Sequence, residues 1–282
     1  ASYPASPASI TVLVALLVGA ALAISGGILQ RLARNPLVSP DIIGVNAGAS
    51  AGAVVMMTAV GAGVVGVTAG ALVGAAAAAV LVYVGAYRNG FDGYRLVLVG
   101  IGVTALLGSA ATFLLSRSDR YVALRAAIWL VGSVSGRTWE HVAVVGGALV
   151  VLAPVVLLAT RQLRLLELGD ELARTLAGRV EGGRTVLLVA AVGLAALATA
   201  AAGPIAFVAL VAPQIVRRML AERTPGLVPA AGVGALVVVA ADLVARQAFS
   251  PSELPVGVLT ALVGAPVLIA LLIRANRIGA AG

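Results

Sequence analysis

The chain has no cysteine and only one histidine, His141, among its 282 residues. It therefore forms neither disulfide bonds nor thiolate metal sites, and one imidazole does not make a metal cage. Charged residues amount to 11% of the chain and aromatic residues to 4%. The basic residues are not gathered in a dense tract with interleaved aromatic side chains, so the formal charge of +8 does not indicate a nucleic-acid-binding protein.

Two other features that the sequence lacks bear on the supply of energy. There is no G-x-x-x-x-G-K-[ST] phosphate loop, so the chain does not hydrolyse ATP by that route. Ion-coupled carriers usually keep an ionisable group well inside the membrane. Here the 11 acidic residues all fall in predicted loops or near predicted helix ends. The sequence thus favours a separate ATPase subunit over an ion-coupled secondary transporter, and a passive structural membrane subunit is a further alternative.

Hydrophobic residues dominate the chain, at 61% of the total and a mean hydropathy of +1.10. Apolar runs of about 20 residues, the length that crosses a bilayer as a helix, recur from end to end. The sequence therefore predicts an all-α, polytopic transmembrane bundle that forms a single domain over residues 1–282. The predicted spans are 10–30, 41–60, 63–87, 96–116, 142–160, 185–203, 227–248 and 255–273.

Residues 204–216 form another apolar segment, which contains Pro204 and Pro213. At 1.5 Å per residue it reaches only about 20 Å, less than the roughly 30 Å of the hydrocarbon core. We expect a short or broken helix enclosed by protein, because lipid does not satisfy freed backbone groups. Together with the cytoplasmic turn that follows, this element is predicted to extend over 204–223, and counting it gives about nine spans.

The arginines are distributed unevenly between the predicted loops. Most of the 19 basic residues lie on alternate loops when the short segment counts as a crossing. By the positive-inside rule these loops are cytoplasmic, with the N-terminus outside and the C-terminus in the cytoplasm. The cytoplasmic set is Arg31, Arg34, Arg88, Arg95, Arg161, Arg164, Arg174, Arg179, Arg184, Arg217, Arg218, Arg223, Arg274 and Arg277, and the outer set is Arg117, Arg120, Arg125, Arg137 and Arg246.

Glycines recur at intervals of four residues within one predicted span, at Gly66, Gly70 and Gly74. Such a stripe of small residues lets a second helix approach closely. We expect a packing surface there, without a functional role.

The most elaborate cytoplasmic loop is predicted at 161–184. Within it, residues 168–178 carry acids at the start, arginine later and glycine near both ends. This order suits a short helix that is aligned favourably with its dipole and ended by Gly178. A rigid element of this kind is suited to contact with a separate ATPase, although a solvated amphipathic connector has the same pattern.

Three long blocks carry prolines and glycines at fixed offsets, at residues 26–50, 203–214 and 254–266. They resemble sequence blocks of the permease subunits of the ABC importers for iron siderophores, haem and vitamin B12, and this resemblance extends over nearly the whole chain. Within that family the chain looks most like the ferric-enterobactin branch, on residues 87–92, 165–170 and 241–243.

The resemblance implies a ten-helix protomer that translocates a ferric siderophore across the bacterial inner membrane. The protomer would pair with a second permease, a paralogue rather than an identical copy, between two ATPase subunits below and a substrate-binding protein above. ATP and magnesium would be held by the ATPases, so this chain would be a non-catalytic subunit with no cofactor of its own. Haem and cobalamin are alternative substrates within the same family.

The resemblance also implies roles for single residues. Glu171-Leu172-Ala173 with Gly178 resembles the coupling loop of ABC importer permeases, and Arg246 matches a residue that docks the binding protein. Arg246 also lies four residues after Asp242, so the two charges could simply neutralise each other. The residues implied in ATPase coupling are Gly169, Asp170, Glu171, Ala173, Arg174 and Gly178; those implied in two cytoplasmic gates are Asn35, Pro36 and Leu37 in one and Gly93 and Tyr94 in the other. A static turn is the alternative for the gates.

The chain departs from the family pattern in two places. Residues 3–9 stand where the family has a first span and an arginine-containing docking stretch, and they have no basic n-region, so we expect missing upstream residues rather than a signal peptide. Gln214 stands where histidine is common, which disfavours a mechanism that needs a titrating side chain there.

Trp139 and His141 are expected to anchor an outer helix end at the membrane interface.

Overall fold

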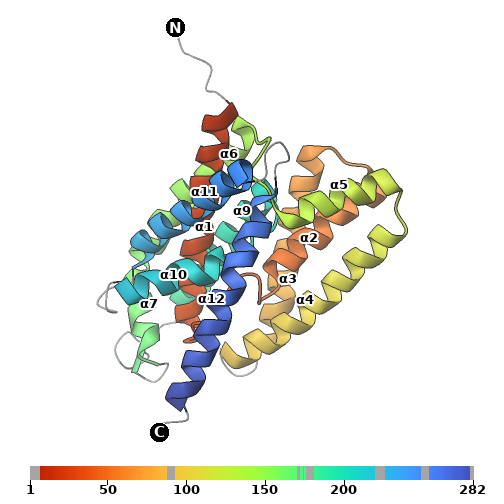
Figure 1. The fold of residues 1–282 in the computed structure, drawn as a ribbon. Coiled ribbons are helices and arrows are strands. Elements are labelled where there is room, and N and C mark those ends of the chain that lie inside the picture. Colours follow the sequence, from red (N-terminus) through yellow and green to blue (C-terminus); the bar gives the residue numbers. More distant parts are fainter. Residues whose placement is uncertain are drawn as a thin grey trace.

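The computed structural model describes residues 7–87, 93–169, 172, 173, 175, 181–219, 226–248 and 254–279. Over these residues the regular structure is entirely helical, which confirms the predicted all-α class. The elements, labelled as in Figure 1, are α1 (Pro7–Leu32), α2 (Val45–Val55), the π-helix η1 (Met56–Val60), α3 (Val64–Ala86), α4 (Gly93–Ser116), α5 (Arg120–Val131), α6 (Trp139–Leu158), α7 (Thr160–Glu167), α9 (Glu181–Ala202), α10 (Val208–Met219), α11 (Leu227–Ala248) and α12 (Val256–Gly279).

Six of the described helices are long and apolar enough to cross a membrane, namely α1, α3, α4, α6, α9 and α11. Two shorter apolar helical stretches are Val45–Val60 and Val256–Ala270. α10 has only 12 residues, or about 18 Å of helix, which confirms the short element predicted after Gly203. In Figure 1, α1 begins at the upper end of the molecule and α12 ends at the lower end.

The helices α1 and α9 form the centre of the bundle. Of their apolar windows, 72% and 61% are buried, whereas the value is 33% or less in the other four long helices. α1 packs against α6, α9, α10 and α11, and Figure 1 shows these helices around it. Small residues permit this close packing, since Gly19 lies against Gly234 of α11, and Gly26 lies against Ala209 of α10.

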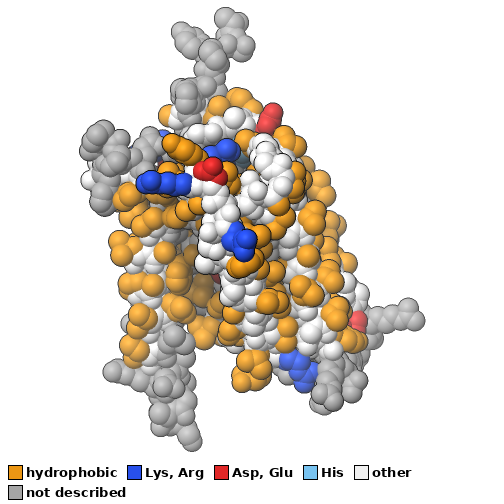
Figure 2. Space-filling view, turned by 90° about the vertical axis from the view of Figure 1, so that its right-hand side faces the viewer, with side chains coloured by type: hydrophobic (Ala, Val, Ile, Leu, Met, Phe, Trp, Pro, Cys, Tyr) orange, Lys and Arg blue, Asp and Glu red, His pale blue; other side chains and the backbone are white. Residues whose placement is uncertain are grey.

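The outer faces of the peripheral helices are apolar as well. Val65 and Val80 of α3, Leu106 of α4 and Val150 of α6 are each more than half exposed. Figure 2 shows one face of the molecule on which hydrophobic side chains predominate and most charged side chains lie toward the upper and lower ends. A hydrophobic surface of this extent is typical of a protein that is surrounded by lipid.

Several helix boundaries differ from the sequence prediction for local reasons. The span expected at 41–60 becomes helical only at Val45, because residues 39–44 form hydrogen-bonded turns that end in Gly44 at φ +86°. The short helix begins at Val208, so Pro204 lies before it and only Pro213 lies inside it. The span expected at 185–203 begins earlier, at Glu181.

The stretch between the predicted spans 96–116 and 142–160 contains a further helix, α5. Asp119 caps it by accepting a hydrogen bond from the backbone N–H of Tyr121 at 3.1 Å. Its 12 residues are too few to cross a bilayer, so a search for long apolar runs does not find it. In Figure 1, α5 lies at the upper right, close to α2.

The glycine stripe of α3 is a packing surface, as predicted. Gly70 and Gly74 face Gly52 and Gly48 of α2, and an added Cβ atom on any of the four would overlap backbone atoms of the opposite helix. Gly66 instead lies against Ala62 and Met56. The contact between α2 and α3 is therefore made backbone to backbone, which only glycine permits.

The substitution Gly74→Val should destabilise the protein by about 1–3 kcal/mol, because the branched side chain forces α2 and α3 apart. The melting temperature of the purified chain in detergent measures this effect. Gly108→Val on α4 is the matched control, since an added Cβ atom there meets nothing within 4 Å. Equal melting temperatures for the two variants would contradict the packing role.

Candidate functional site

The two segments predicted as gates lie side by side. Asn35, Pro36 and Leu37 belong to the loop of residues 33–44 between α1 and α2, called the α1–α2 loop below. Gly93, the first residue of α4, rests on this loop, because an added Cβ atom would lie 2.5 Å from the carbonyl oxygen of Ala33. The loop is an ordered turn, in which the Leu37 backbone N–H donates to Asn35 Oδ1 at 3.0 Å. Tyr94 is 77% exposed.

Two buried glutamines tie the α1–α2 loop to α10. The amide of Gln214 in α10 donates to Gln30 Oε1 and to the Pro36 carbonyl oxygen, both at 3.0 Å. The amide of Gln30 in α1 donates to the Leu210 carbonyl oxygen at 3.1 Å. Gln30 is 0% exposed and Gln214 is 8% exposed. The sequence singled out Gln214 by its departure from the family pattern, but nothing in it indicated Gln30 as the partner.

The other end of the α1–α2 loop is bound to the start of α10. Asp41 accepts hydrogen bonds from the side-chain amide of Asn46 and from the backbone N–H of Phe207, the latter at 3.3 Å. Thr199 of α9 donates in turn to Asn46 Oδ1 at 2.8 Å. A carboxylate beside the first N–H groups of a helix is also favoured by the helix dipole. The loop is thus attached to α10 at both of its ends.

The segment predicted to couple to an ATPase starts beside the same loop. Arg31, in the last turn of α1, forms an ion pair with Glu167 at the end of α7, with Nε and Oε1 3.2 Å apart. Gly169 has a φ of +102°, and an added Cβ atom would lie 3.3 Å from Nη1 of Arg34. Ala173 is buried, and its N–H donates to the Gly169 carbonyl oxygen at 2.9 Å. Asp170, Glu171, Arg174 and Gly178 lie outside the described residues.

At the opposite end of α9, two of the family-like blocks meet the end of α5. Gly132 and Gly203 both adopt positive φ, +79° and +78°, which favours glycine. The backbone N–H of Ser133 donates to the Ala202 carbonyl oxygen at 2.8 Å, and that of Gly257 donates to the Gly132 carbonyl oxygen at 3.2 Å. Gly132 also lies against the Pro204 carbonyl, so the blocks 203–214 and 254–266 both contact the turn at Gly132.

Arg137, Trp139 and His141 lie at the start of α6 or just before it. His141 is 8% exposed, and its Nδ1 accepts a hydrogen bond from the Thr138 backbone N–H at 3.2 Å, so it caps α6 rather than facing the interface. Trp139, in contrast, is 53% exposed. Arg137 closes the preceding turn by donating twice to the Ser133 carbonyl oxygen, and burial lowers the pKa of Arg137.

The predicted docking residue Arg246 is paired with Asp242 within α11. The Asp242 side chain is 5% exposed and that of Arg246 is 27% exposed, so the pair is largely withdrawn from solvent. Asp242 lies in the second half of α11, which has the bounds predicted for this span, but its burial was not predicted. The structure thus shows Arg246 neutralised by Asp242, whereas the docking of a binding protein at Arg246 stays a prediction.

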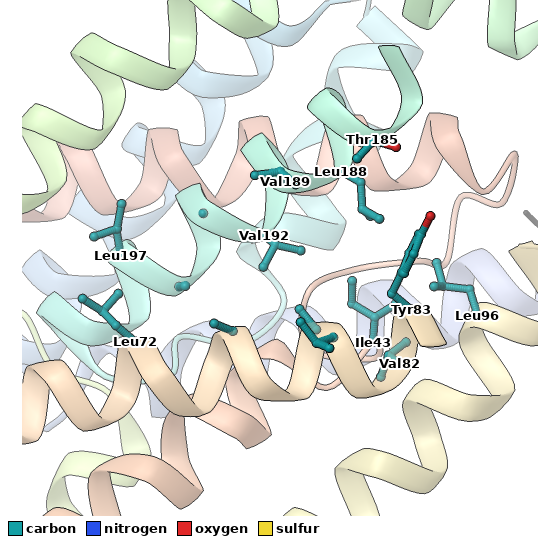
Figure 3. Close-up of a pocket in the computed structure, with 15 residues that line it drawn as sticks. Ile43, Leu72, Val82, Tyr83, Leu96, Thr185, Leu188, Val189, Val192 and Leu197 are labelled. Atoms are coloured by element: carbon teal, nitrogen blue, oxygen red, sulfur yellow. The ribbon is translucent and has the colours of Figure 1, made fainter. Parts of the chain in front are cut away.

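A groove of about 520 Å³ lies between α3 and α9 (Figure 3). Tyr83, Leu96 and Thr185 lie at one end of it, and Leu72 and Leu197 lie at the other. Ile43 of the α1–α2 loop forms part of its wall, and none of its lining residues is charged. The groove is therefore an apolar surface between two helices of membrane-spanning length, and it is separate from the polar contacts of α10.

The bundle of apolar helices, with α1 and α9 at its centre and the short α10 packed against α1, matches a solved structure. The chain is similar to one from a metal-chelate type ABC transporter in an inward-facing conformation, with a TM-score of 0.85 and 29% identity over 94% of this chain and 87% of that chain. The chain belongs to the FecCD transport family, whose sequence profile matches residues 9–274. The family resemblance found in the sequence is thereby confirmed.

Curated relatives of the chain are permease proteins of iron-chelate transport systems. The chain is 45% identical to the ferric enterobactin transport system permease protein FepG of Escherichia coli (strain K12), over 94% of this chain and 81% of that protein. It is 44% identical to the achromobactin transport system permease protein CbrC of Dickeya dadantii (strain 3937), over 93% and 76%. The chain is therefore a multi-pass membrane protein of a transport family.

Arg246→Ala should destabilise the protein by roughly 1–3 kcal/mol, because it removes the ion-pair partner of a buried carboxylate. Adding Asp242→Asn should recover part of that loss, since the remaining group is then uncharged. Thermal unfolding in detergent measures both effects, with Arg125→Ala on the exposed side of α5 as the control. If Arg246→Ala behaves like the control, the pair does not stabilise α11.

Proposed function

We propose that this chain is the membrane-spanning permease subunit of an ATP-driven importer of ferric siderophores in the bacterial inner membrane. Its partners are a second permease, two ATPase subunits that hold ATP and magnesium, and a substrate-binding protein on the outer side. The C-terminus lies in the cytoplasm. Family membership and the ferric enterobactin relative support the substrate class.

The observation that supports the mechanism is a junction of three elements at the predicted cytoplasmic end. The α1–α2 loop, with Asn35, Pro36 and Leu37, contacts the start of α4 at Gly93. The same loop follows directly after Arg31, which is paired with Glu167 just before the coupling segment. A displacement of that segment by the ATPases would therefore reach both gate segments through the end of α1. Coupling of this kind needs only packed elements with two arrangements.

The decisive test is ATP hydrolysis by the chain reconstituted in lipid with its candidate ATPase, with and without a binding protein loaded with ferric siderophore. We expect the loaded protein to stimulate hydrolysis and labelled iron to enter the vesicles. A binding protein loaded with haem or cobalamin is the matched control for substrate class. Uptake that survives ATP depletion and collapses with the proton gradient would instead identify a secondary transporter.

Arg31→Glu and Glu167→Arg should each lower the iron transported per ATP by roughly two- to fivefold, because each turns a partly exposed attraction into a repulsion. The two changes combined restore the opposite charges and should recover coupling. Glu181→Arg is the control, since the ion pair of Glu181 with Arg184 lies within α9. A double variant that is no better than either single variant would show that the pair does not transmit the movement.

A further inference from the structure

Several hydrogen bonds hold the α1–α2 loop and the end of α1 against α10, and the proposed function does not explain them. Gln214 donates to the Pro36 carbonyl oxygen at the start of the loop, and the Phe207 N–H donates to Asp41 near its end. Gln30, which precedes the loop, donates to the Leu210 carbonyl oxygen. A hinge that moved freely would not need two attachments of its own to α10 and the residue before it, with a third from the helix end that leads into it.

The attachments lie where α10 itself is irregular. Pro213 has no N–H, so it leaves the Ala209 carbonyl without its usual helical partner, and it lies next to Gln214. Gly26 of α1 allows the backbone of α1 to approach that carbonyl, and Gln30 of the same helix bonds the next one, at Leu210. The backbone groups of α10 around its proline are thus covered by α1 rather than by lipid.

Both N–H groups of the Gln214 amide are engaged, one by Gln30 Oε1 and one by the Pro36 carbonyl. Because both glutamines are buried, water does not replace the bond between them if one amide is removed. Loss of the Gln214 amide would leave Gln30 Oε1 and the partly buried Pro36 carbonyl oxygen without this donor, and the latter belongs to the predicted gate.

We propose that Gln30 and Gln214 are positioning residues that fasten the α1–α2 loop to α10, so that the loop and α10 move together when the pathway opens. The proposal rests on the proposed function for the meaning of that movement, but the fastening itself is a property of this chain alone. The cytoplasmic gate is then a composite of the loop and the short helix, rather than a hinge within the loop.

The test uses a spin label on Leu37→Cys in the full chain, in lipid nanodiscs. The chain has no cysteine of its own, so the label is placed at one position only. Adding Gln214→Leu or Gln30→Leu should raise the ratio of mobile to immobile spectral components roughly tenfold, because a buried hydrogen-bonded amide is lost. Gln214→His keeps one neutral donor and should give an intermediate ratio.

The matched control is Ser25→Ala, which removes a buried hydrogen bond between α1 and α9, from Ser25 Oγ to the Ala191 carbonyl oxygen at 2.6 Å. It should lower thermal stability without changing the spectrum at position 37. In separate samples, a label on Val150→Cys, at an exposed position on α6, reports whether the variants keep the fold.

An unchanged spectrum at position 37 in Gln214→Leu, with the Val150 spectrum intact, would overturn the proposal, and so would an equal change in Ser25→Ala. The spectra need no substrate and no ATPase. If the unaltered chain with its ATPase does not transport siderophore while the glutamine variants have mobile loops, the proposed function is refuted and the fastening is left in place. Siderophore transport by the unaltered chain, together with unchanged spectra in the glutamine variants, would do the reverse.

Discussion

The rest of the structure depends on the short length of α10. With 12 residues it does not cross a bilayer, so its first turn lies inside the protein, where Val208, Ala209 and Leu210 are almost completely buried. Backbone groups at such a helix end must find partners in the protein, because lipid supplies none. Asp41 accepts from one such N–H group, that of Phe207, and Gln30 donates to the Leu210 carbonyl oxygen in the first turn, so the α1–α2 loop and the end of α1 are both held against α10.

The need to enclose the short helix α10 in protein also explains why three blocks that lie far apart in the sequence are rich in glycine and proline. The block 26–50 supplies α1 and the loop that cover α10, and the block 203–214 supplies α10 itself. The block 254–266 packs against the block 203–214, where Gly264 lies against Phe207. Small residues are needed where backbones meet directly, and the prolines interrupt helical hydrogen bonding, both before α10 at Pro204 and inside it at Pro213.

The sequence predicts what depends on local pattern. Apolar runs indicated the long helices, two prolines indicated the short one, and the spacing of Gly70 and Gly74 indicated a close helix contact. Long-range pairing has no such local signal, so the partnership of Gln30 with Gln214 could not be predicted. The helix α5 was not predicted, because its 12 residues are too few for a search for membrane-spanning runs. The sequence also did not predict that Asp242 is buried. Its charge is neutralised by Arg246 on the same helix, which makes burial inside the bundle possible.

The two carboxylates inside the described part of the bundle alter the argument about energy supply. A proton-coupled carrier needs an acid that changes partners during the cycle. Asp242 is paired with Arg246 on its own helix, and Asp41 is held by Asn46 and Phe207. Each carboxylate therefore has a structural role that a change of protonation would weaken. The contact of Arg31 with Glu167 instead links the end of α7 to the loop that α10 holds, and this is the route by which the proposed ATPases would move that loop.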